Sequence, residues 1–316
     1  MTASAAEISR LMSRAGAYAC GFCVAEPVCD ADIEALNWWV GAGNHADMDW
    51  MTRNSDIRRD PRLLLDGAQT LIVSIFNYHA PEVAPQTKHA RIASYARVRD
   101  YHIVLRERLA TVAEAIRARY GGECRICIDS APLRERYWAQ RAGLGYCARN
   151  GQLTVPGAGD AFFIATILWT GTVDIYSEPY SGPGCGNCRR CVDACPTGAL
   201  HGDGTLDCRR CLSYLTIESH SDIPADINPH GNMFGCDTCR LACPHSHNAP
   251  ATAVTEFRTP HPAALLTPEE WLKTGTSAFR RITSGSPLSR VRLAHLKSVI
   301  RRLEIPGKGQ TGTPHD

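Results

Sequence analysis

Residues 185–196 read Cys-Gly-Asn-Cys-Arg-Arg-Cys-Val-Asp-Ala-Cys-Pro and carry the strongest structural signal in this chain. Cys185, Cys188 and Cys191 follow one another at intervals of three residues, Cys195 comes four residues later, and proline is next. Bacterial ferredoxins hold [4Fe–4S] clusters with this spacing, and the fourth cysteine of such a run binds the neighbouring cluster. The run therefore predicts a ferredoxin-like domain that carries electrons through two [4Fe–4S] clusters.

A second run, Cys236-x-x-Cys239-x-x-x-Cys243-Pro, repeats the first without its leading cysteine. Cys208 and Cys211 lie between the two runs, and either can supply the missing ligand. Two cubanes need eight thiolates, and exchange of the fourth cysteines between the runs assigns them. We expect the first cluster to bind Cys185, Cys188, Cys191 and Cys243, and the second to bind Cys195, Cys236, Cys239 and one of Cys208 or Cys211.

Two other uses of these cysteines fit the pattern less well. A structural zinc site takes four ligands, usually as two Cys-x-x-Cys pairs, and gives no reason for the proline after each run. Disulfide scaffolds belong to short secreted domains, and the N-terminal residues show no secretory pattern. The cysteines outside residues 185–243 are interpreted as small buried hydrophobes. They are Cys20, Cys23, Cys29, Cys124, Cys127 and Cys147.

The composition is that of an ordinary globular protein. The chain has 316 residues, of which 44% are hydrophobic and 21% charged, so we expect two or three domains. No apolar run is long enough to cross a membrane, and we expect a cytoplasmic protein with no membrane partner. A net charge of +2 does not by itself indicate a nucleic-acid-binding protein. Basic residues do gather in residues 88–108 and 290–302, however, and from charge alone solvated helix faces are the better explanation.

The order of segments predicts an α/β domain before the cluster region. Strand-like runs lie at residues 71–76, 124–128 and 161–169, and a helix between the first two ends at Gly121-Gly122. We divide the chain into an α/β domain over 1–176, the ferredoxin-like domain over 177–255 and a short C-terminal helical segment over 256–305. The tail, 306–316, is polar and is expected to be disordered.

Asp129 directly follows the predicted strand 124–128 and begins the segment 129–145. A carboxyl group at a strand end, ahead of a helix, is well placed to act as an acid if burial raises its pKa. It is equally well placed to cap that helix or to pair with Arg134 or Arg136. The residues alone leave both interpretations open.

Several segments together resemble epoxyqueuosine reductase, a family of cobalamin-dependent iron–sulfur enzymes that complete the queuosine modification of tRNA. They are Ile57-Arg-Arg-Asp-Pro-Arg62, Ser94-Tyr-Ala-Arg-Val-Arg-Asp-Tyr-His102, residues 129–145, the cysteine run, Cys211-Leu-Ser-Tyr-Leu-Thr-Ile-Glu218 and Gly235-Cys-Asp-Thr-Cys-Arg-Leu-Ala-Cys-Pro244. Val98 and Ala148 stand where the family usually has glycine, and residues 286–292 resemble the first of its C-terminal helical repeats.

The resemblance implies a reductase-like α/β domain that binds base-off cobalamin and the substrate, with a partial helical repeat at the C-terminus. It makes Asp129 the proton donor, close to the cobalamin, with Tyr101, His102 and Arg136 near the substrate pocket. It selects Cys211 as the eighth cluster ligand. The corrin and its tail would be approached by Arg58, Arg97, Ser213 and Asp237, and by backbone near Thr154.

The expected activity is reduction of epoxyqueuosine to queuosine at the anticodon wobble position. Two electrons and two protons convert the epoxide to an alkene and release water. The expected partners are the tRNA anticodon stem-loop and a reductant such as a flavodoxin or ferredoxin. The basic residues of 88–108 and 290–302, Arg290 and Arg292 among them, are expected to bind phosphates of this RNA. The alternatives are another cobalamin and iron–sulfur reductase of the reductive dehalogenase kind, a plain ferredoxin-type electron-transfer protein, and a nucleic-acid-binding protein with structural clusters.

Overall fold

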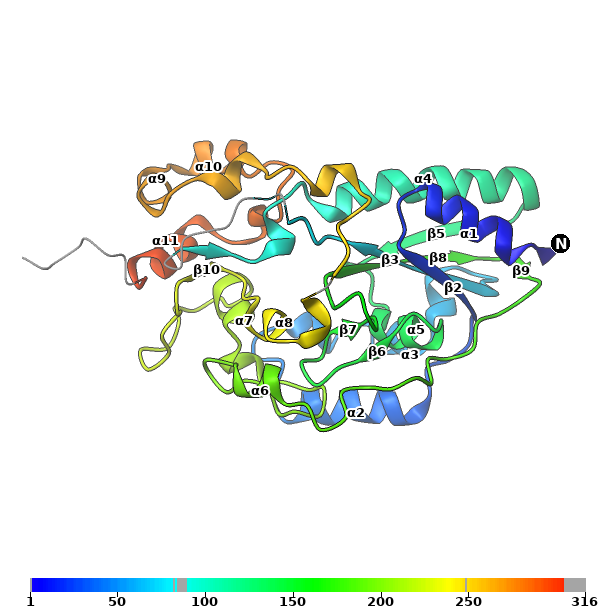
Figure 1. The fold of residues 1–316 in the computed structure, drawn as a ribbon, viewed down its shortest axis with the longest axis horizontal. Coiled ribbons are helices and arrows are strands. Elements are labelled where there is room, and N and C mark those ends of the chain that lie inside the picture. The colour runs from blue at the N-terminus through cyan, green and yellow to red at the C-terminus, as the bar shows by residue number, and fades with distance from the viewer. Residues whose placement is uncertain (1, 82, 84–89, 248, 304–316) are drawn as a thin grey trace, which may run out of the picture.

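The computed structural model describes residues 2–81, 83, 90–247 and 249–303 (Figure 1). Its centre is a four-stranded sheet in the order β2 (Ala19–Val24), β3 (Thr70–Asn77), β8 (Phe162–Trp169) and β5 (Cys124–Ile128). Every neighbouring pair in this sheet is antiparallel. The three strands predicted from the sequence are β3, β5 and β8, and the α/β class is confirmed.

Helices cover both faces of this sheet, which Figure 1 shows as three layers. Helices α1 (Ala5–Arg14) and α4 (Tyr101–Tyr120) pack on one face, and α5 (Glu135–Arg141) packs on the other, with α2 (Asp30–Gly41) farther from the sheet on that side. The short helix α3 spans Ser55–Arg59. Strand β3 is buried along its whole length because successive side chains enter opposite layers. Leu71 and Val73 pack with α5, whereas Ile72 and Phe76 pack with α4.

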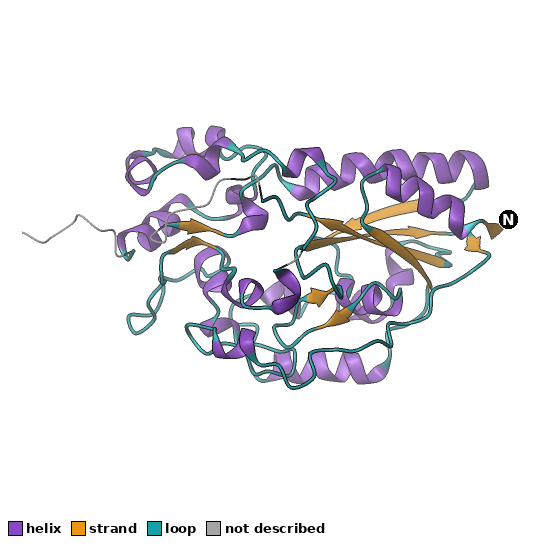
Figure 2. Cartoon of the chain, in the orientation of Figure 1, coloured by secondary structure: helices purple, strands orange, loops and turns teal. Residues whose placement is uncertain are grey.

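The cluster region consists of short elements joined by loops (Figure 2). They are α6 (Arg190–Asp193), the 3-10 helix η4 (Cys208–Arg210), α7 (Leu212–Ile217), β10 (Asn232–Phe234) and α8 (Thr238–Leu241). Helices α6 and α8, one from each cysteine run, lie against each other. Between the two cysteine runs, apolar side chains of Leu212, Leu215, Ile223 and Ile227 are buried together with Val299 of the C-terminal segment.

The C-terminal segment forms α9 (Pro268–Lys273), α10 (Thr276–Ile282), the 3-10 helix η8 (Pro287–Arg290) and α11 (Leu293–Arg301). Helix α11 is the last amphipathic helix that the sequence predicts, and it packs on α7, α9 and β10. Strand β4 (Arg91–Ile92) pairs with β10 and brings the α/β domain into the same core. The remaining strand pairs are β1 (Thr2–Ala3) with β9 (Thr172–Val173), and β6 (Tyr146–Cys147) with β7 (Leu153–Thr154).

The predicted domain boundaries stay a prediction, because the cores are shared across them. Val254 and Phe257 are buried in the core of the α/β layer, where Phe257 packs on Phe163. Among the described residues no helix is long and apolar enough to cross a membrane. The predicted disordered tail, 306–316, lies outside the described residues.

The six cysteines outside residues 185–243 do not all lie in the interior. The prediction that all six are buried is wrong for Cys29 and Cys147, which are exposed. Val98 and Ala148, the residues that replace glycine, are both buried in the described structure. Next to Ala148, the Arg149 guanidinium donates to the carbonyl oxygens of Gly186 and Gly202 and so supports the first cysteine loop.

Candidate active site

The cysteines of residues 185–243 form two groups in space. Burial raises the pKa of Cys239, and the neighbouring thiols of Cys236, Cys211 and Cys195 raise it further. In the other group the thiol of Cys243 lies near those of Cys191 and Cys185, and Cys191 also lies near Cys188. These are the two interleaved sets that exchange of the fourth cysteines predicts, and they support the ligand assignment.

The groups also suit cubanes chemically. Each thiolate of a cubane binds a different iron, so the four sulfurs stand further apart than around one ion. In the described part of the chain, no three His, Cys, Asp or Glu side chains are arranged to hold a single metal ion. Although burial opposes ionisation of Cys195, backbone N–H groups of Thr197 and Ala199 lower its pKa, which favours a thiolate.

Cys208 differs from these eight cysteines. It is buried at the start of η4, and burial raises the pKa of its thiol to about 12, with smaller contributions from Cys211 and Asp207. Its place among the thiols separates it from Cys211: Cys211 lies near Cys236, Cys195 and Cys239, whereas Cys208 is buried among apolar side chains such as Leu212 and Leu215. The structure therefore favours Cys211 as the eighth ligand, as the resemblance implied.

Asp129 follows β5 and adopts a left-handed backbone conformation, with φ of 52°. Its Oδ2 atom lies 3.1 Å from Nε2 of His102 and accepts a hydrogen bond of 3.0 Å from Nη1 of Arg290. Helix α5 begins at Glu135 without a side-chain cap, and Arg134 pairs with Asp32. The interpretation of Asp129 as a helix cap or a partner of Arg134 is therefore wrong.

His102 joins two carboxylates. Its Nδ1 atom lies 2.8 Å from Oδ1 of Asp100, while Nε2 faces Asp129. Burial alone would lower the pKa of His102, but the two aspartates raise it to about 9. Because each ring nitrogen faces a carboxylate, the imidazole is protonated at neutral pH.

Asp129 itself is ionised in this arrangement. Its partial removal from water would by itself raise its pKa, but the hydrogen bond from His102 and the charge of Arg290 hold it well below its usual range. The Tyr101 hydroxyl adds to this effect. Tyr101 is the first residue of α4, is buried, and stacks on the rings of Phe163 and His102 at 4.1 Å each. The resting proton of this site is thus on His102.

Glu135 is a site residue that the sequence analysis missed. Its Oε1 atom accepts a 2.8 Å hydrogen bond from the backbone N–H of Asp129 and holds the left-handed turn in place. Burial and the nearby charge of Asp129 raise the pKa of Glu135 to about 8. Two neighbouring carboxyl groups with pKa values moved in opposite directions are typical of catalytic centres. Arg136, which was expected at the pocket, is exposed on α5 next to Glu135.

Arg290 and Glu218 are also site residues that sequence reasoning missed. Arg290 was expected to contact RNA phosphates, but it binds Asp129, and its Nη2 atom lies 3.6 Å from Oε1 of Glu218. Glu218 ends α7, the helix whose first turn is preceded by Cys211. One arginine and one short helix therefore connect the Asp129 carboxylate with a predicted cluster ligand.

The residues expected around the corrin are partly engaged with the protein. Asp237 accepts hydrogen bonds from the N–H and hydroxyl of Ser94, at 2.7 and 2.6 Å, and pairs with Arg240. Ser213 is half-buried in α7, two residues after Cys211, and Arg97 is half-buried beside the Asp100 turn. Only part of the predicted set is therefore open to a ligand.

Two of the expected cofactor residues have unused polar capacity. The Nε atom of Arg58 and the hydroxyl of Thr154 are buried without a hydrogen-bond partner among the described residues. Thr154 pairs across β6–β7 with Tyr146, whose hydroxyl lies near the thiols of Cys185 and Cys243. Buried polar groups normally have partners, so both atoms fit a cofactor with amide and phosphate groups.

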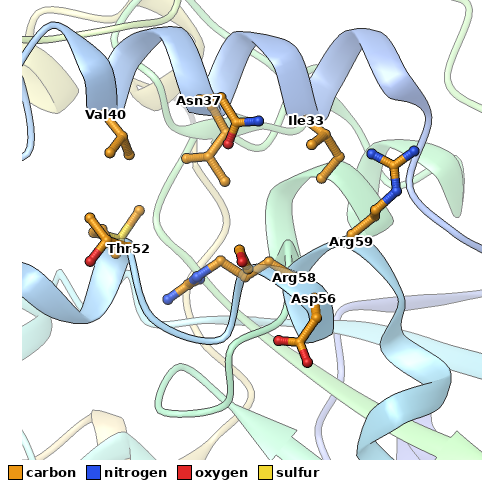
Figure 3. Close-up of a pocket in the computed structure, with 10 residues that line it drawn as sticks. Ile33, Asn37, Val40, Thr52, Asp56, Arg58 and Arg59 are labelled. Carbon is orange, nitrogen blue, oxygen red and sulfur yellow. The ribbon is translucent and has the colours of Figure 1, made fainter.

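Arg58 also lines a cleft of about 360 Å³ between α2, α3 and the 3-10 helix η1 (Asp49–Met51). Figure 3 shows the Arg58 side chain extending into the space between the helices. Its Nη2 atom donates to the carbonyl oxygen of Trp50. Helix α2 lines the cleft with three apolar side chains and the amide of Asn37, and the opposite side is mostly polar, with hydroxyl and guanidinium groups and the Asp56 carboxylate.

The sequence matches two family models. The epoxyqueuosine reductase QueG, DUF1730 model covers residues 58–130, and the 4Fe-4S double cluster binding domain model covers residues 184–246. Solved structures share the fold. An epoxyqueuosine reductase crystallised with an epoxyqueuosine-modified tRNA stem loop has a TM-score of 0.83 at 23% identity, covering 93% of this chain and 80% of that one. The Streptococcus thermophilus epoxyqueuosine reductase gives 0.80 at 25% identity, with the same coverage.

Curated relatives match nearly the whole chain. The epoxyqueuosine reductase of Cyclobacterium marinum is 33% identical over 90% of this chain and 92% of its own length. The epoxyqueuosine reductase of Xanthomonas campestris is 35% identical over 92% of this chain and 83% of its own length. That of Vibrio cholerae is 36% identical over 84% of this chain and 74% of its own length. The chain belongs to the epoxyqueuosine reductase family.

Proposed function

We propose that this protein reduces epoxyqueuosine to queuosine at the wobble position of tRNA, using two [4Fe–4S] clusters and base-off cobalamin. The observation that carries the proposal is the Asp129–His102 pair, a proton-holding centre that Arg290 and α7 join to Cys211. A plain electron-transfer protein has no use for such a centre. A tRNA substrate also makes the cytoplasm the place of reaction.

The reaction needs two electrons and two protons. When bound, cobalamin supplies a strongly reducing cobalt centre, which the clusters serve one electron at a time. Arg58 and Thr154 would help to hold it, because they have the unused polar atoms. A low-potential carrier such as a flavodoxin or ferredoxin would supply the electrons to the clusters.

The chain's own residues manage the protons. His102 stores a proton at Nε2, against Oδ2 of Asp129, and Asp129 passes it to the epoxide oxygen as that oxygen leaves. This is the first of the two protons, and the second, which completes the water molecule, is taken from solvent. Tyr101 fixes the ring of His102 by stacking, and Glu135 fixes the backbone of Asp129. Because the Asp129 carboxylate is ionised at rest, Asp129 transfers the proton, and His102 is the residue that holds it between turnovers.

The test is nucleoside analysis of tRNA after incubation with the protein. Anaerobically purified protein, reduced and supplied with cobalamin, is expected to convert the epoxyqueuosine of tRNA to queuosine in repeated turnovers. Spectra of the same sample should show corrin bands beside broad cluster absorption. Intact clusters and bound cobalamin without conversion of the nucleoside would contradict the proposal.

The rate should depend on pH through His102. Its folded pKa of about 9 lies above the usual value of 6.5, so the stored proton is present at neutral pH and is lost as pH rises through about 9. Turnover should therefore fall above that pH. In His102→Gln the rate should be lower throughout and this alkaline decline should be absent. An unchanged decline in the variant would assign it to another group.

Binding of tRNA should depend on salt through fewer arginines than the sequence suggested. Lys88 lies outside the described residues, Arg108 pairs with Glu256, and Arg302 donates to carbonyl oxygens of residues 223–227. Arg292 and Arg301 are exposed, and Arg292 lies two residues from the active-site Arg290. We propose that these two contact phosphates of the anticodon stem-loop.

Affinity for the stem-loop should then fall with salt, by a slope of roughly 0.7 per phosphate contact. The double variant Arg292→Ala/Arg301→Ala should flatten that slope by roughly 1.4 while cluster content stays unchanged. Arg117→Ala, an exposed arginine at the far end of α4, is the matched control and should have no effect. Equal slopes in the wild type and the double variant would place the phosphate contacts elsewhere.

A further inference from the structure

The backbone around Arg290 is held in place by its neighbours, independently of the ion pairs that the Arg290 side chain makes. Arg290 ends η8, and its neighbours Leu288 and Val291 are buried with 0% and 2% of their surface exposed. The hydroxyl of Ser286 accepts a hydrogen bond from the N–H of Leu288 and fixes the turn. The backbone that carries Arg290 is therefore anchored in the core, and only its guanidinium extends toward the site.

The same C-terminal segment touches the site at a second point. The carbonyl oxygen of Gly285 accepts a 2.8 Å hydrogen bond from the N–H of Asp100. Asp100 contacts His102, His102 contacts Asp129, and Asp129 accepts from Arg290. The chain from Gly285 to Arg290 thus closes a ring of contacts around the proton store.

The ion pair contributes little to stability by itself, because both partners are well exposed. The side chains of Arg290 and Asp129 keep 41% and 43% of their surface accessible, and such pairs are screened by water and salt. The Arg290–Asp129 ion pair has a larger effect on the ionisation of the groups in the active site. The groups that face Asp129 are the cations His102 and Arg290, the Tyr101 hydroxyl and the Glu135 carboxyl, with Asp100 and Glu218 behind them.

We infer that Arg290 is a positioning residue of the active site: it fixes the Asp129 carboxylate against His102 and ties it to the helix that begins at Cys211. The inference rests on the proposed function for its kinetic consequences. Residues 285–290 then belong to the catalytic centre. Arg290 has a different role from Arg292 and Arg301, which are proposed to contact phosphates. The function of Arg290 is to keep the relay oriented and charged.

The test compares Arg290→Gln, which loses the charge, with Arg290→Lys, which keeps it but loses the planar fork. In Arg290→Gln we expect kcat to fall roughly tenfold while KM for tRNA and the salt slope of binding stay within about twofold, because the relay is misplaced and the tRNA contacts are not. The alkaline decline should move to higher pH, since a neighbouring cation no longer opposes the charge on His102. Arg290→Lys should restore the position of that decline and part of kcat. Arg281→Gln, an exposed arginine on α10, is the matched control.

Hydrogen exchange of the cluster-loaded protein supplies a readout without turnover. Arg290→Gln should speed exchange in both 129–134 and 285–291, whereas Arg281→Gln should not. If Arg290→Gln instead raises KM and flattens the salt slope with kcat unchanged, Arg290 is a phosphate contact and the inference is wrong. Unchanged exchange in both segments would also overturn it. If the wild type fails to convert epoxyqueuosine but the exchange pattern appears as expected, the proposed function fails and the positioning contact stands.

Discussion

Asp129→Asn is expected to fold, to load both clusters and to bind cobalamin, yet to convert epoxyqueuosine roughly a hundredfold more slowly or worse. Asparagine adopts the left-handed conformation of this position readily, whereas alanine would add strain of about 1 kcal/mol. The backbone N–H of residue 129 can still bind Glu135, and an amide oxygen can still accept from Arg290. What the amide cannot do is take the proton of His102 and pass it on.

The measurement is single-turnover conversion of the nucleoside, with iron content and cobalamin binding determined on the same sample. Asp66→Asn, an exposed aspartate before β3, is the matched control and should react at the wild-type rate. Near-normal turnover by Asp129→Asn would leave Asp129 as a structural anchor and point to Glu135, whose pKa of about 8 makes it the other available acid.

The second large effect is expected at the eighth cluster ligand. Cys211→Ser should lose or degrade one cluster and lower the iron content from about eight to about four per chain. Cys208→Ser should keep about eight, because the Cys208 thiol is a buried packing group. If serine at position 208 disturbs the core, Cys208→Ala makes the same comparison without a buried hydroxyl.

Iron analysis and electron paramagnetic resonance of the reduced protein distinguish the two variants. Loss of a cluster in Cys208→Ser, with a full complement in Cys211→Ser, would reverse the assignment. Since Cys211 is followed directly by α7, loss of its cluster should also disturb Glu218 at the other end of that helix. Turnover in Cys211→Ser should therefore fall for two reasons: one cluster no longer carries electrons, and the contact of Glu218 with the active-site Arg290 is disturbed.

The sequence predicted those parts of the site that local patterns encode. The cysteine runs are such a pattern, because ligands to one cubane must recur at short intervals along a loop. Asp129 was found because it follows a recognisable strand, and its environment then excluded the helix cap. Its role as the acid stays a prediction, and the condition attached to it was wrong, because the pKa of Asp129 is lowered and not raised. The division into two cluster sets needed only the spacing rule, and the grouping of the thiols agrees with it.

Contacts between distant segments were not predictable in the same way. Arg290 lies 161 positions after Asp129, in a segment rich in arginine, and nothing in its neighbourhood distinguishes it from Arg292. Glu135 stands between two arginines, so an unremarkable surface helix was the natural interpretation. The pKa values of both depend on burial that only the packed structure provides. A basic segment therefore predicts a positive surface without telling which of its members face inward.

The interleaved cysteine sets also constrain the order in which a newly made chain can mature. The last ligand of the first set is Cys243 and that of the second is Cys239, although both sets take their first ligands from the run 185–195. During synthesis from the N-terminus, neither set is complete until about three-quarters of the 316 residues have been made. Three thiolates of the first set must wait, exposed to oxidants and to the wrong metals, for a ligand more than fifty residues away. Cluster delivery to this protein must therefore be a late event, and a truncation before residue 239 should yield a chain that completes neither cluster.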